Sequence, residues 1–358
     1  MGTRELQTEY KELFKKPADE VTAYFAEKPL ILENVRLERQ DISDSTFHDA
    51  QFFNTEWIDS RAIESTFINA RFHGGSMRRT GFGKSRLVNV IFEDVTFDTV
   101  SFVAAELINV TFRNCKIYNS EIRNLNNSNV SIVDSELSNV SFFQSLLQLK
   151  IRNSKIVEAI EFMGAQTGSS VDISDSEIGR YSDFGGSNFV SFEIRNTKID
   201  NSSANGITAK KVILDNVVSD FAIADSTVGS VEIKSLSGRF SLGGTKAVSA
   251  VIEDCSAQKI YLDEFVADRL SLRKCNIEKF VLDAAIVKDA TLANLTVDEL
   301  VLDSLKAGKL ALNNVLINHK LSAQGAMAEE IPAPNWRVAA GAAIEAEGSN
   351  IPMPKPGL

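Results

Sequence analysis

The sequence predicts an all-β solenoid, in which the chain coils in short strands around an apolar core. Three observations predict this fold. Large apolar side chains recur at every fifth position, asparagine or aspartate often follows two positions later, and no proline occurs between residues 30 and 331. A period of five fits neither an α-helix, with about 3.6 residues per turn, nor an ordinary strand, whose side chains alternate.

Residues 1–29 are predicted to form a helical N-terminal cap, because a solenoid exposes unpaired backbone and apolar core at its ends. A first short helix would present an apolar face formed by Leu6, Tyr10, Leu13 and Phe14. A second, beginning after Pro17, would present Val21, Tyr24 and Phe25. A cap is preferred here to a helix that binds a partner.

Residues 30–149 carry the repeat in its most regular form. Of 24 positions at intervals of five, 23 are apolar, whereas the whole chain is 44% apolar, and the exception is Asn127. The positions are Leu32, Leu37, Ile42, Phe47, Phe52, Trp57, Ala62, Phe67, Phe72, Met77, Phe82, Leu87, Phe92, Phe97, Phe102, Leu107, Phe112, Ile117, Ile122, Asn127, Ile132, Leu137, Phe142 and Leu147. A mostly small residue lies two positions before each. This pattern predicts a chain that turns by a right angle every five residues and closes a square coil of twenty.

In this pattern the sequence resembles the pentapeptide-repeat family, whose fold is a right-handed quadrilateral β-helix. The resemblance covers residues 30–149 and implies a right-handed β-helix here. The repeats are degenerate. The family favours Asp or Asn immediately before the central Leu or Phe, whereas this chain has varied polar residues there, such as Thr96, Ser101, Glu106, Thr111 and Lys116.

The rest of the chain is predicted to continue the solenoid less evenly. Residues 150–241 keep spacings of five or ten, but with slips and glycine interruptions, which indicates irregular coils. Residues 242–321 form a second regular stack, in which all 16 positions at intervals of five from Leu242 to Ile317 are apolar. Residues 322–358 are predicted as a C-terminal cap and a flexible Pro/Ala-rich tail, with Trp336 as its anchor.

Composition and charge limit the cellular compartment in which the protein is expected and the kinds of partner it is expected to bind. A net charge of −10 without clustered Lys and Arg disfavours direct binding of nucleic acid. No apolar run is long enough to span a membrane, and no conventional signal peptide is recognised at the N-terminus. We therefore expect a cytoplasmic protein whose partners are other proteins, with non-classical secretion left open. Three cysteines do not indicate a disulfide framework.

No motif in the sequence requires an enzyme, a cofactor or a metal. The stretch 81–85, GFGKS, lacks the glycine that a phosphate-binding loop requires, since that position is Arg78. The three histidines are scattered. Cys255 and Cys275 stand twenty residues apart at inward positions, which favours a buried column of thiols over a disulfide or a zinc site.

Residues twenty apart share a face, so outward positions can be read as columns. Ile68, Val88 and Ile108 form an apolar column with His48 at its edge, and Val103 and Phe143 lie on a neighbouring side. An interface, with a second copy or another protein, and a stripe covered by the protein's own loops are weighed equally.

An acidic column is predicted in the second stack, formed by Asp263, Asp283 and Asp303. Like charges on adjacent strands cost stability, so nearby Arg273, Lys274, Lys259 and Lys279 are candidates for compensation. Ordinary solvation is preferred here to a binding role.

These features favour a non-enzymatic scaffold that docks partner proteins through its faces and ends. One alternative is an acidic DNA mimic that binds a type II topoisomerase, a role that some members of the family have. A second is a secreted bacterial effector or a component associated with a secretion system, in which related repeats also occur.

Overall fold

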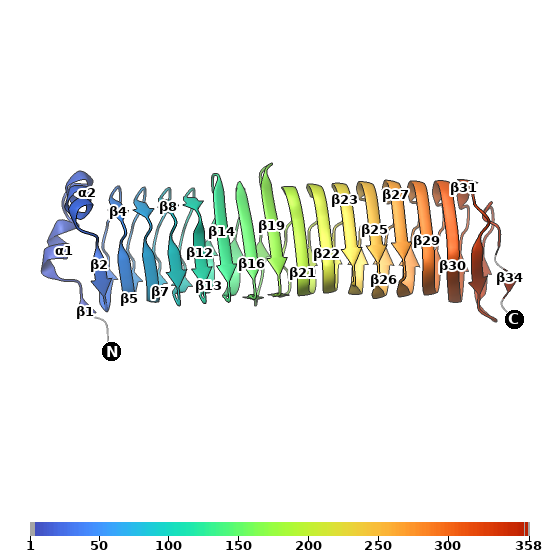
Figure 1. Ribbon diagram of the computed structural model, residues 1–358, viewed down its shortest axis with the longest axis horizontal. Helices are drawn as coiled ribbons and strands as arrows, with labels where there is room; N and C mark the ends of the chain where they lie inside the picture. The colour runs from blue at the N-terminus through green and yellow to red at the C-terminus, as the bar shows by residue number, and fades with distance from the viewer. Residues whose placement is uncertain (1–3, 354, 357–358) are drawn as a thin grey trace. The chain divides into compact units, whose positions relative to one another are not determined.

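The structure, a computed structural model, describes residues 4–353 and 355–356. The chain divides into two compact units, Met1–Asp183 and Phe184–Leu358. Each unit is a stack of coils whose strands pair in parallel with strands of the neighbouring coils (Figure 1). The protein is therefore an all-β solenoid, a β-helix, as the sequence predicts.

Two short helices precede the coils of the first unit, α1 (Thr8–Leu13) and α2 (Ala18–Glu27). Pro17 occupies the N-cap of α2, where its missing N–H costs nothing. The Phe25 ring packs against that of Phe47 with centroids 5.6 Å apart, and the Thr46 N–H donates to Thr22 Oγ1 at 2.9 Å. The helix thus covers the apolar core of the first coil, in the place of the predicted cap. Among the described residues, no helix is long and apolar enough to cross a bilayer.

Among the described residues, the first unit contains twenty strands. They are β1 (Arg4–Glu5), β2 (Ile31–Glu33), β3 (Val35–Glu38), β4 (Thr46–His48), β5 (Gln51–Ile58), β6 (Thr66–Ile68), β7 (Arg71–Arg78), β8 (Arg86–Val88), β9 (Ile91–Glu93), β10 (Thr96–Asp98), β11 (Glu106–Ile108), β12 (Val110–Arg113), β13 (Lys116–Glu121), β14 (Ser128–Val133), β15 (Glu136–Ser141), β16 (Leu147–Arg152), β17 (Lys155–Ile156), β18 (Ile160–Glu161), β19 (Ser169–Ser174) and β20 (Glu177–Ile178).

Aromatic side chains fill the interior of the first unit. Phe52 stacks on Phe72 with ring centroids 4.3 Å apart, Phe72 on Phe92 at 4.6 Å, and Phe92 on Phe112 at 5.0 Å. These four rings are at most 1% exposed. Because the coil repeats every twenty residues, the same inward position recurs in register, and the period of five becomes a set of continuous apolar columns.

The corners of the coils explain why Asn and Asp follow the large residues. Corner residues adopt the left-handed conformation, as at Asn69 (φ 56°) and Asn89 (φ 55°), which Asn and Asp tolerate better than most side chains. Their amides also bond from coil to coil: Asn89 donates to Asn69 at 3.1 Å, and Asn109 donates to Asn89 at 3.0 Å. One residue type therefore provides both the turn and a polar ladder along the corner.

The register first slips at Asn127, the polar exception among the 24 repeat positions. Asn127 is exposed with φ 43°, and Ser128 is buried. Ser128 then pairs with Leu147, nineteen residues later, whereas Val110 and Val130 in the preceding coil are twenty apart. The next coil is longer, because Leu149 pairs with Val171, twenty-two residues later. The one polar residue among the 24 repeat positions thus coincides with the end of the strict repeat, and the structure places it outside the core, with Ser128 buried instead.

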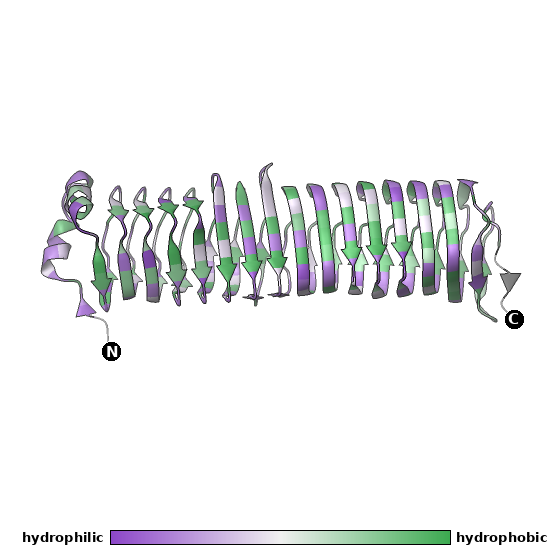
Figure 2. Cartoon of the chain, viewed as in Figure 1, coloured by the Kyte–Doolittle hydropathy of each residue, from purple (hydrophilic) through white to green (hydrophobic). Residues whose placement is uncertain are grey.

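In the part of the second unit that the structure describes there are fourteen strands, some of which continue across a corner. They are β21 (Asn188–Ser203), β22 (Thr208–Ala222), β23 (Thr227–Lys234), β24 (Ser237–Ser241), β25 (Lys246–Glu253), β26 (Ser256–Tyr261), β27 (Val266–Arg273), β28 (Asn276–Val281), β29 (Ile286–Val301), β30 (Lys306–Ser322), β31 (Met327–Glu330), β32 (Asn335–Val338), β33 (Ala343–Glu345) and β34 (Lys355–Pro356). Apolar and polar bands alternate along them (Figure 2).

The region predicted as cap and tail contains short strands. Trp336, on β32, is 6% exposed and pairs with Val315 of β30. Further on, the Ala328 N–H donates to Asn350 Oδ1 at 2.9 Å, and Asn350 Nδ2 donates to the Ala328 carbonyl at 2.8 Å. The Asn350 side chain thus takes the place of a strand beside Ala328. Residues 354, 357 and 358 of the predicted flexible end lie outside the described residues.

Candidate functional site

The predicted apolar column lies on a four-stranded sheet of the first unit, formed by β4, β6, β8 and β11. His48, Ile68, Val88 and Ile108 are in direct register across these strands. Ile68, Val88 and Ile108 are half-buried, and His48 is exposed. We call these three aliphatic residues the unit 1 column. The asparagine ladder runs beside it, since each corner residue follows a column residue directly in the chain.

Val103 and Phe143 lie on a different side of the coil from the unit 1 column. Backbone hydrogen bonds relate neighbouring coils here: the Ala104 N–H donates to the Arg123 carbonyl, and the Asn124 N–H donates to the Phe143 carbonyl. Arg123 therefore separates Val103 from Phe143 in their column. The structure places both residues half-buried but does not join them to the unit 1 column.

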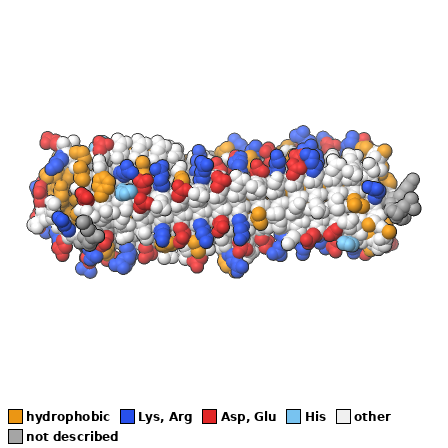
Figure 3. Space-filling view, turned by 60° about the horizontal axis from the view of Figure 1, so that its bottom comes forward, with side chains coloured by type: hydrophobic (Ala, Val, Ile, Leu, Met, Phe, Trp, Pro, Cys, Tyr) orange, Lys and Arg blue, Asp and Glu red, His pale blue; other side chains and the backbone are white. Residues whose placement is uncertain are grey.

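Several basic side chains of the first unit are paired with acidic ones from neighbouring coils. Lys84 meets Glu64 at 2.8 Å, and Arg86 meets Glu106 at 2.7 Å. Their partners lie twenty residues away, at the same position of the next coil. On the face drawn in Figure 3, basic and acidic side chains are accordingly interspersed.

The three aspartates of the acidic column follow one another on successive coils of the second unit. The Glu264 N–H donates to the Asp283 carbonyl and the Ala284 N–H to the Asp303 carbonyl, which places the three aspartates on successive coils. Asp303 accepts hydrogen bonds from the Ser322 hydroxyl and the Gln324 N–H, both at 2.7 Å.

Three of the four cations considered as compensation lie near other carboxylates. Lys279 pairs with Glu299 at 3.0 Å, and Lys274 pairs with Glu253 at 3.1 Å. Arg273 is near Glu253 at 3.7 Å. Among the described residues, no ion pair joins Lys259 or these three cations to the aspartate column.

The cysteines are buried thiols. Burial raises the pKa of Cys115 to about 12, so the thiol stays protonated at neutral pH. Cys255 and Cys275 lie 2% and 3% exposed on neighbouring coils, and the hydrogen bond between the thiols together with burial raises the pKa of Cys255. Within the described part of the chain, no group of three or more His, Cys, Asp or Glu side chains could hold a metal ion.

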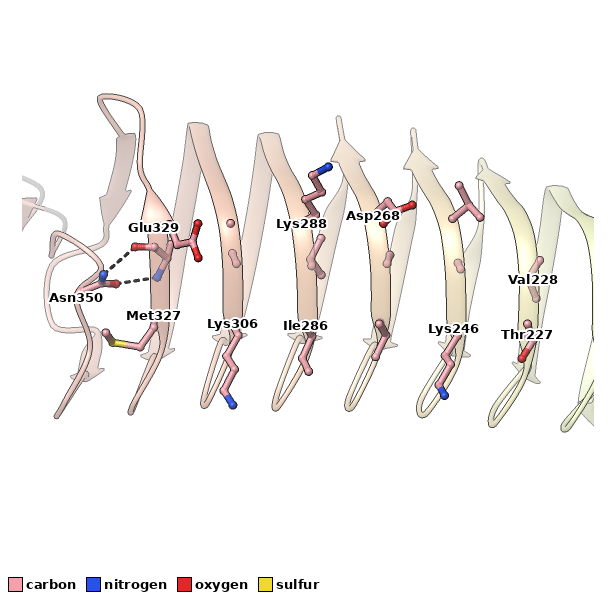
Figure 4. Close-up of a pocket in the computed structure, with 18 residues that line it drawn as sticks. Thr227, Val228, Lys246, Asp268, Ile286, Lys288, Lys306, Met327, Glu329 and Asn350 are labelled. Carbon is pink, nitrogen blue, oxygen red and sulfur yellow. Dashed lines mark hydrogen bonds between the residues drawn. The ribbon is translucent and has the colours of Figure 1, made fainter.

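An apolar groove on the second unit was not predicted from the sequence. It has a volume of about 790 Å³ and crosses six coils, from β23 to β31 (Figure 4). Its first rim consists of Lys246, Val266, Ile286, Lys306 and Met327. Its second rim consists of Val248, Asp268, Lys288, Gly308 and Glu329. We call this feature the unit 2 groove.

The unit 2 groove is hollow between its rims because the residues there have short side chains: Ala247, Ala267, Val287, Ala307 and Ala328. Val248, Ile286 and Met327 on the rims are 53%, 50% and 48% exposed. Aliphatic side chains this exposed, gathered along one groove, are typical of a binding surface. Asn350 closes the C-terminal end of the groove, where it bonds to Ala328 (Figure 4).

Part of the repeat in the first unit is similar to a known protein family. Residues 65–142 match the family model described as the pentapeptide repeat region. The chain carries a pentapeptide-repeat region. This region spans β6 to β15 and includes all three residues of the unit 1 column, whereas the unit 2 groove lies outside it.

Solved structures of other proteins resemble this chain only distantly. One is QnrB1, a plasmid-mediated fluoroquinolone resistance protein, at 16% identity, covering 49% of this chain and 82% of that one, with a TM-score of 0.27. Another is HetL, a pentapeptide repeat protein involved in heterocyst differentiation regulation from the cyanobacterium Nostoc sp. strain PCC 7120. It is 12% identical and covers 70% of this chain and 96% of its own, with a TM-score of 0.28. Likeness at this level does not transfer a function. No curated protein matches the sequence.

Proposed function

We propose that this protein is a non-enzymatic scaffold that docks partner proteins on the outer faces of its coils. The observation that carries the proposal is the unit 1 column, three aliphatic side chains in register on neighbouring strands of one sheet. Apolar side chains occupy the inward positions, so recognition falls to the outward ones.

A coil ladder suits docking because its side chains are held in place before the partner arrives. The hydrogen-bonded strands and the asparagine ladder fix the spacing of the column. A preorganised surface loses less conformational entropy on binding than a mobile one does. Apolar contact along the column would provide affinity, and the polar ladder beside it would form part of a hydrated rim.

The test is a crosslinked pull-down from native cell extract with wild-type protein and an Ile68→Asp, Val88→Asp, Ile108→Asp variant. We expect the variant to lose the partner, because three carboxylates would be desolvated in the interface. A matched control carries Asp at Ile91, Thr111 and Ser131, which are also half-buried and in register on consecutive strands.

Circular dichroism and thermal melting of both variants would establish that they fold. Loss of the partner in the first variant alone would support the column as a docking surface. Recovery of only a second copy of the chain would make the column a homodimer interface. Wild-type binding by the first variant would exclude the column as the interface.

No specific observation favours DNA mimicry. In the first unit, basic side chains such as those of Arg79 and Lys84 pair with Asp59 and Glu64, and they interrupt the acidic surface. A supercoiling assay of a type II topoisomerase, unaffected by excess protein, would exclude this alternative. No specific observation favours the secreted effector or secretion-associated alternative either.

A further inference from the structure

The first rim of the unit 2 groove combines aliphatic side chains with cations. Lys246 and Lys306 flank Val266 and Ile286, and Figure 4 shows both lysines on the same side of the groove as Ile286. Among the described residues, neither lysine has an ion-pair partner. Lys309 and Lys320, on the same strand as Lys306, do pair, with Glu330 at 3.2 Å and Glu345 at 2.9 Å. The rim therefore offers positive charge to an external group.

The backbone of the first rim has no free donors for an added strand. The N–H groups of Lys246, Val266, Ile286, Lys306 and Met327 all donate to carbonyls of the preceding coil, at 2.8 to 3.0 Å. A peptide lying along the groove could therefore not extend the sheet, and an extended backbone would leave its own polar groups without protein partners. An α-helix satisfies its backbone internally, so it suits this groove better.

The dimensions of the groove set the length of such a helix. From Thr227 to Met327 the groove crosses six coils, and five steps of about 4.8 Å give a length of about 24 Å. A helix rises about 1.5 Å per residue, so roughly sixteen residues would fill it. An apolar stripe along that helix would meet Val248, Ile286 and Met327.

The spacing of the lysines sets the charge pattern. Lys246 and Lys306 lie three coils apart, which corresponds to about 14 Å along the groove. Carboxylates about ten or eleven residues apart on the helix would reach both ammonium groups. Lys288 lies on the second rim. A third acidic side chain of the bound helix, on the opposite side of its apolar stripe, could pair with it.

We propose that the unit 2 groove binds an acidic amphipathic α-helix of a partner protein. The apolar face of the helix contacts the groove, and its carboxylates pair with Lys246 and Lys306. The proposal shares with the docking function only the premise that the ligand is a protein. It concerns a different surface, so the substitutions in the unit 1 column do not change the unit 2 groove. Failure of one proposal therefore leaves the other standing.

The test is a selection from a displayed library of sixteen-residue amphipathic helices, whose apolar stripe is fixed and whose flanking positions are randomised among Glu, Lys, Gln and Ser. The bait is the full chain. We expect enriched peptides to carry Glu at positions ten or eleven residues apart. Binding of a labelled enriched peptide should weaken as salt is raised, because salt screens exposed charge pairs.

Two variants of the full chain locate the site. Ile286→Asp should abolish peptide binding by placing a charge in the apolar groove. Lys246→Glu with Lys306→Glu should weaken binding by about tenfold or more and should favour peptides with Lys at the same positions. The control, Lys198→Glu with Lys234→Glu, makes the same change in charge at exposed lysines outside the groove and should bind as the wild type does.

Several results would overturn the proposal. They are failure to enrich any helix, enrichment of neutral or basic peptides, and equal binding by the Ile286→Asp variant. Anionic phosphatidylglycerol vesicles provide a further comparison: if they bind the wild type but not the Ile286→Asp variant, and no peptide is enriched, the groove takes a lipid surface instead of a helix.

Discussion

At the scale of the residue, asparagine has two roles in this protein. Asn89 adopts the left-handed conformation at a corner (φ 55°), and its side chain both donates to Asn69 and accepts from Asn109. The sequence identified Asn and Asp as corner residues but not the bonds between them. A ladder of amides requires the same corner of successive coils to align, and alignment depends on coil length as well as on residue type.

Replacing Asn89 should therefore cost more than replacing an asparagine outside the ladder. We expect Asn89→Ala to lower the free energy of unfolding by roughly 1–3 kcal/mol, through two lost hydrogen bonds and a left-handed alanine. Asn126→Ala is the control, because Asn126 is exposed and does not have positive φ. Urea unfolding followed by circular dichroism measures both. Equal stability of the two variants would contradict the role of the ladder.

At the scale of the element, α2 holds the open end of the first coil closed. Phe25 is 3% exposed and packs against Phe47, the first member of an inward column. An uncovered strand edge and apolar core are ready to pair with another chain. The helix therefore protects the coils as well as packing on them.

Disrupting this cap should cause association more than local disorder. We expect Phe25→Asp to expose the first coil and to produce concentration-dependent oligomers, measured by size-exclusion chromatography with light scattering. Tyr24→Asp changes the exposed neighbour, which is 38% accessible, and should leave the elution profile unchanged. If both variants elute as the wild type does, the helix is not required as a cap.

The elements also show where sequence reasoning succeeds and where it fails. Phe72 and Phe92 could be placed inside because their period of five is strict, and the structure confirms them. The unit 2 groove could not be found this way. Thr227 is nineteen residues before Lys246, and Met327 is twenty-one after Lys306, so a fixed spacing of twenty misses both ends. Its small central residues, such as Ala267, look like ordinary inward positions.

At the scale of the whole molecule, acidic side chains outnumber basic ones, and many carboxylates are held by a cation one coil away. Hydrogen bonds from Arg79, Lys84 and Arg71 lower the pKa values of Asp59, Glu64 and Glu93, respectively. A carboxyl group with a lowered pKa in the folded state stabilises the fold above its ordinary pKa, and this contribution is lost as the pH falls.

We therefore expect the melting temperature to fall as the pH is lowered below 4.5, the ordinary pKa of a glutamate side chain. Calorimetry of the full chain at a series of pH values from about 7 to about 3 measures it. Lys84→Gln removes one partner and should make the dependence on pH shallower. A melting temperature that stays constant across this range would contradict the assignment.

The in-register columns of the first unit also limit how the chain can change in length. Between β5 and β12, a deletion or insertion of twenty residues removes or adds one coil and leaves every inward column and corner ladder intact. A single-residue insertion in a strand turns all the following side chains to the opposite face, so inward apolar residues point outward. This continues until a second insertion or deletion restores the register. Length variation among relatives should therefore occur in whole coils within this region, with single-residue changes confined to places such as Asn127, where the register already slips.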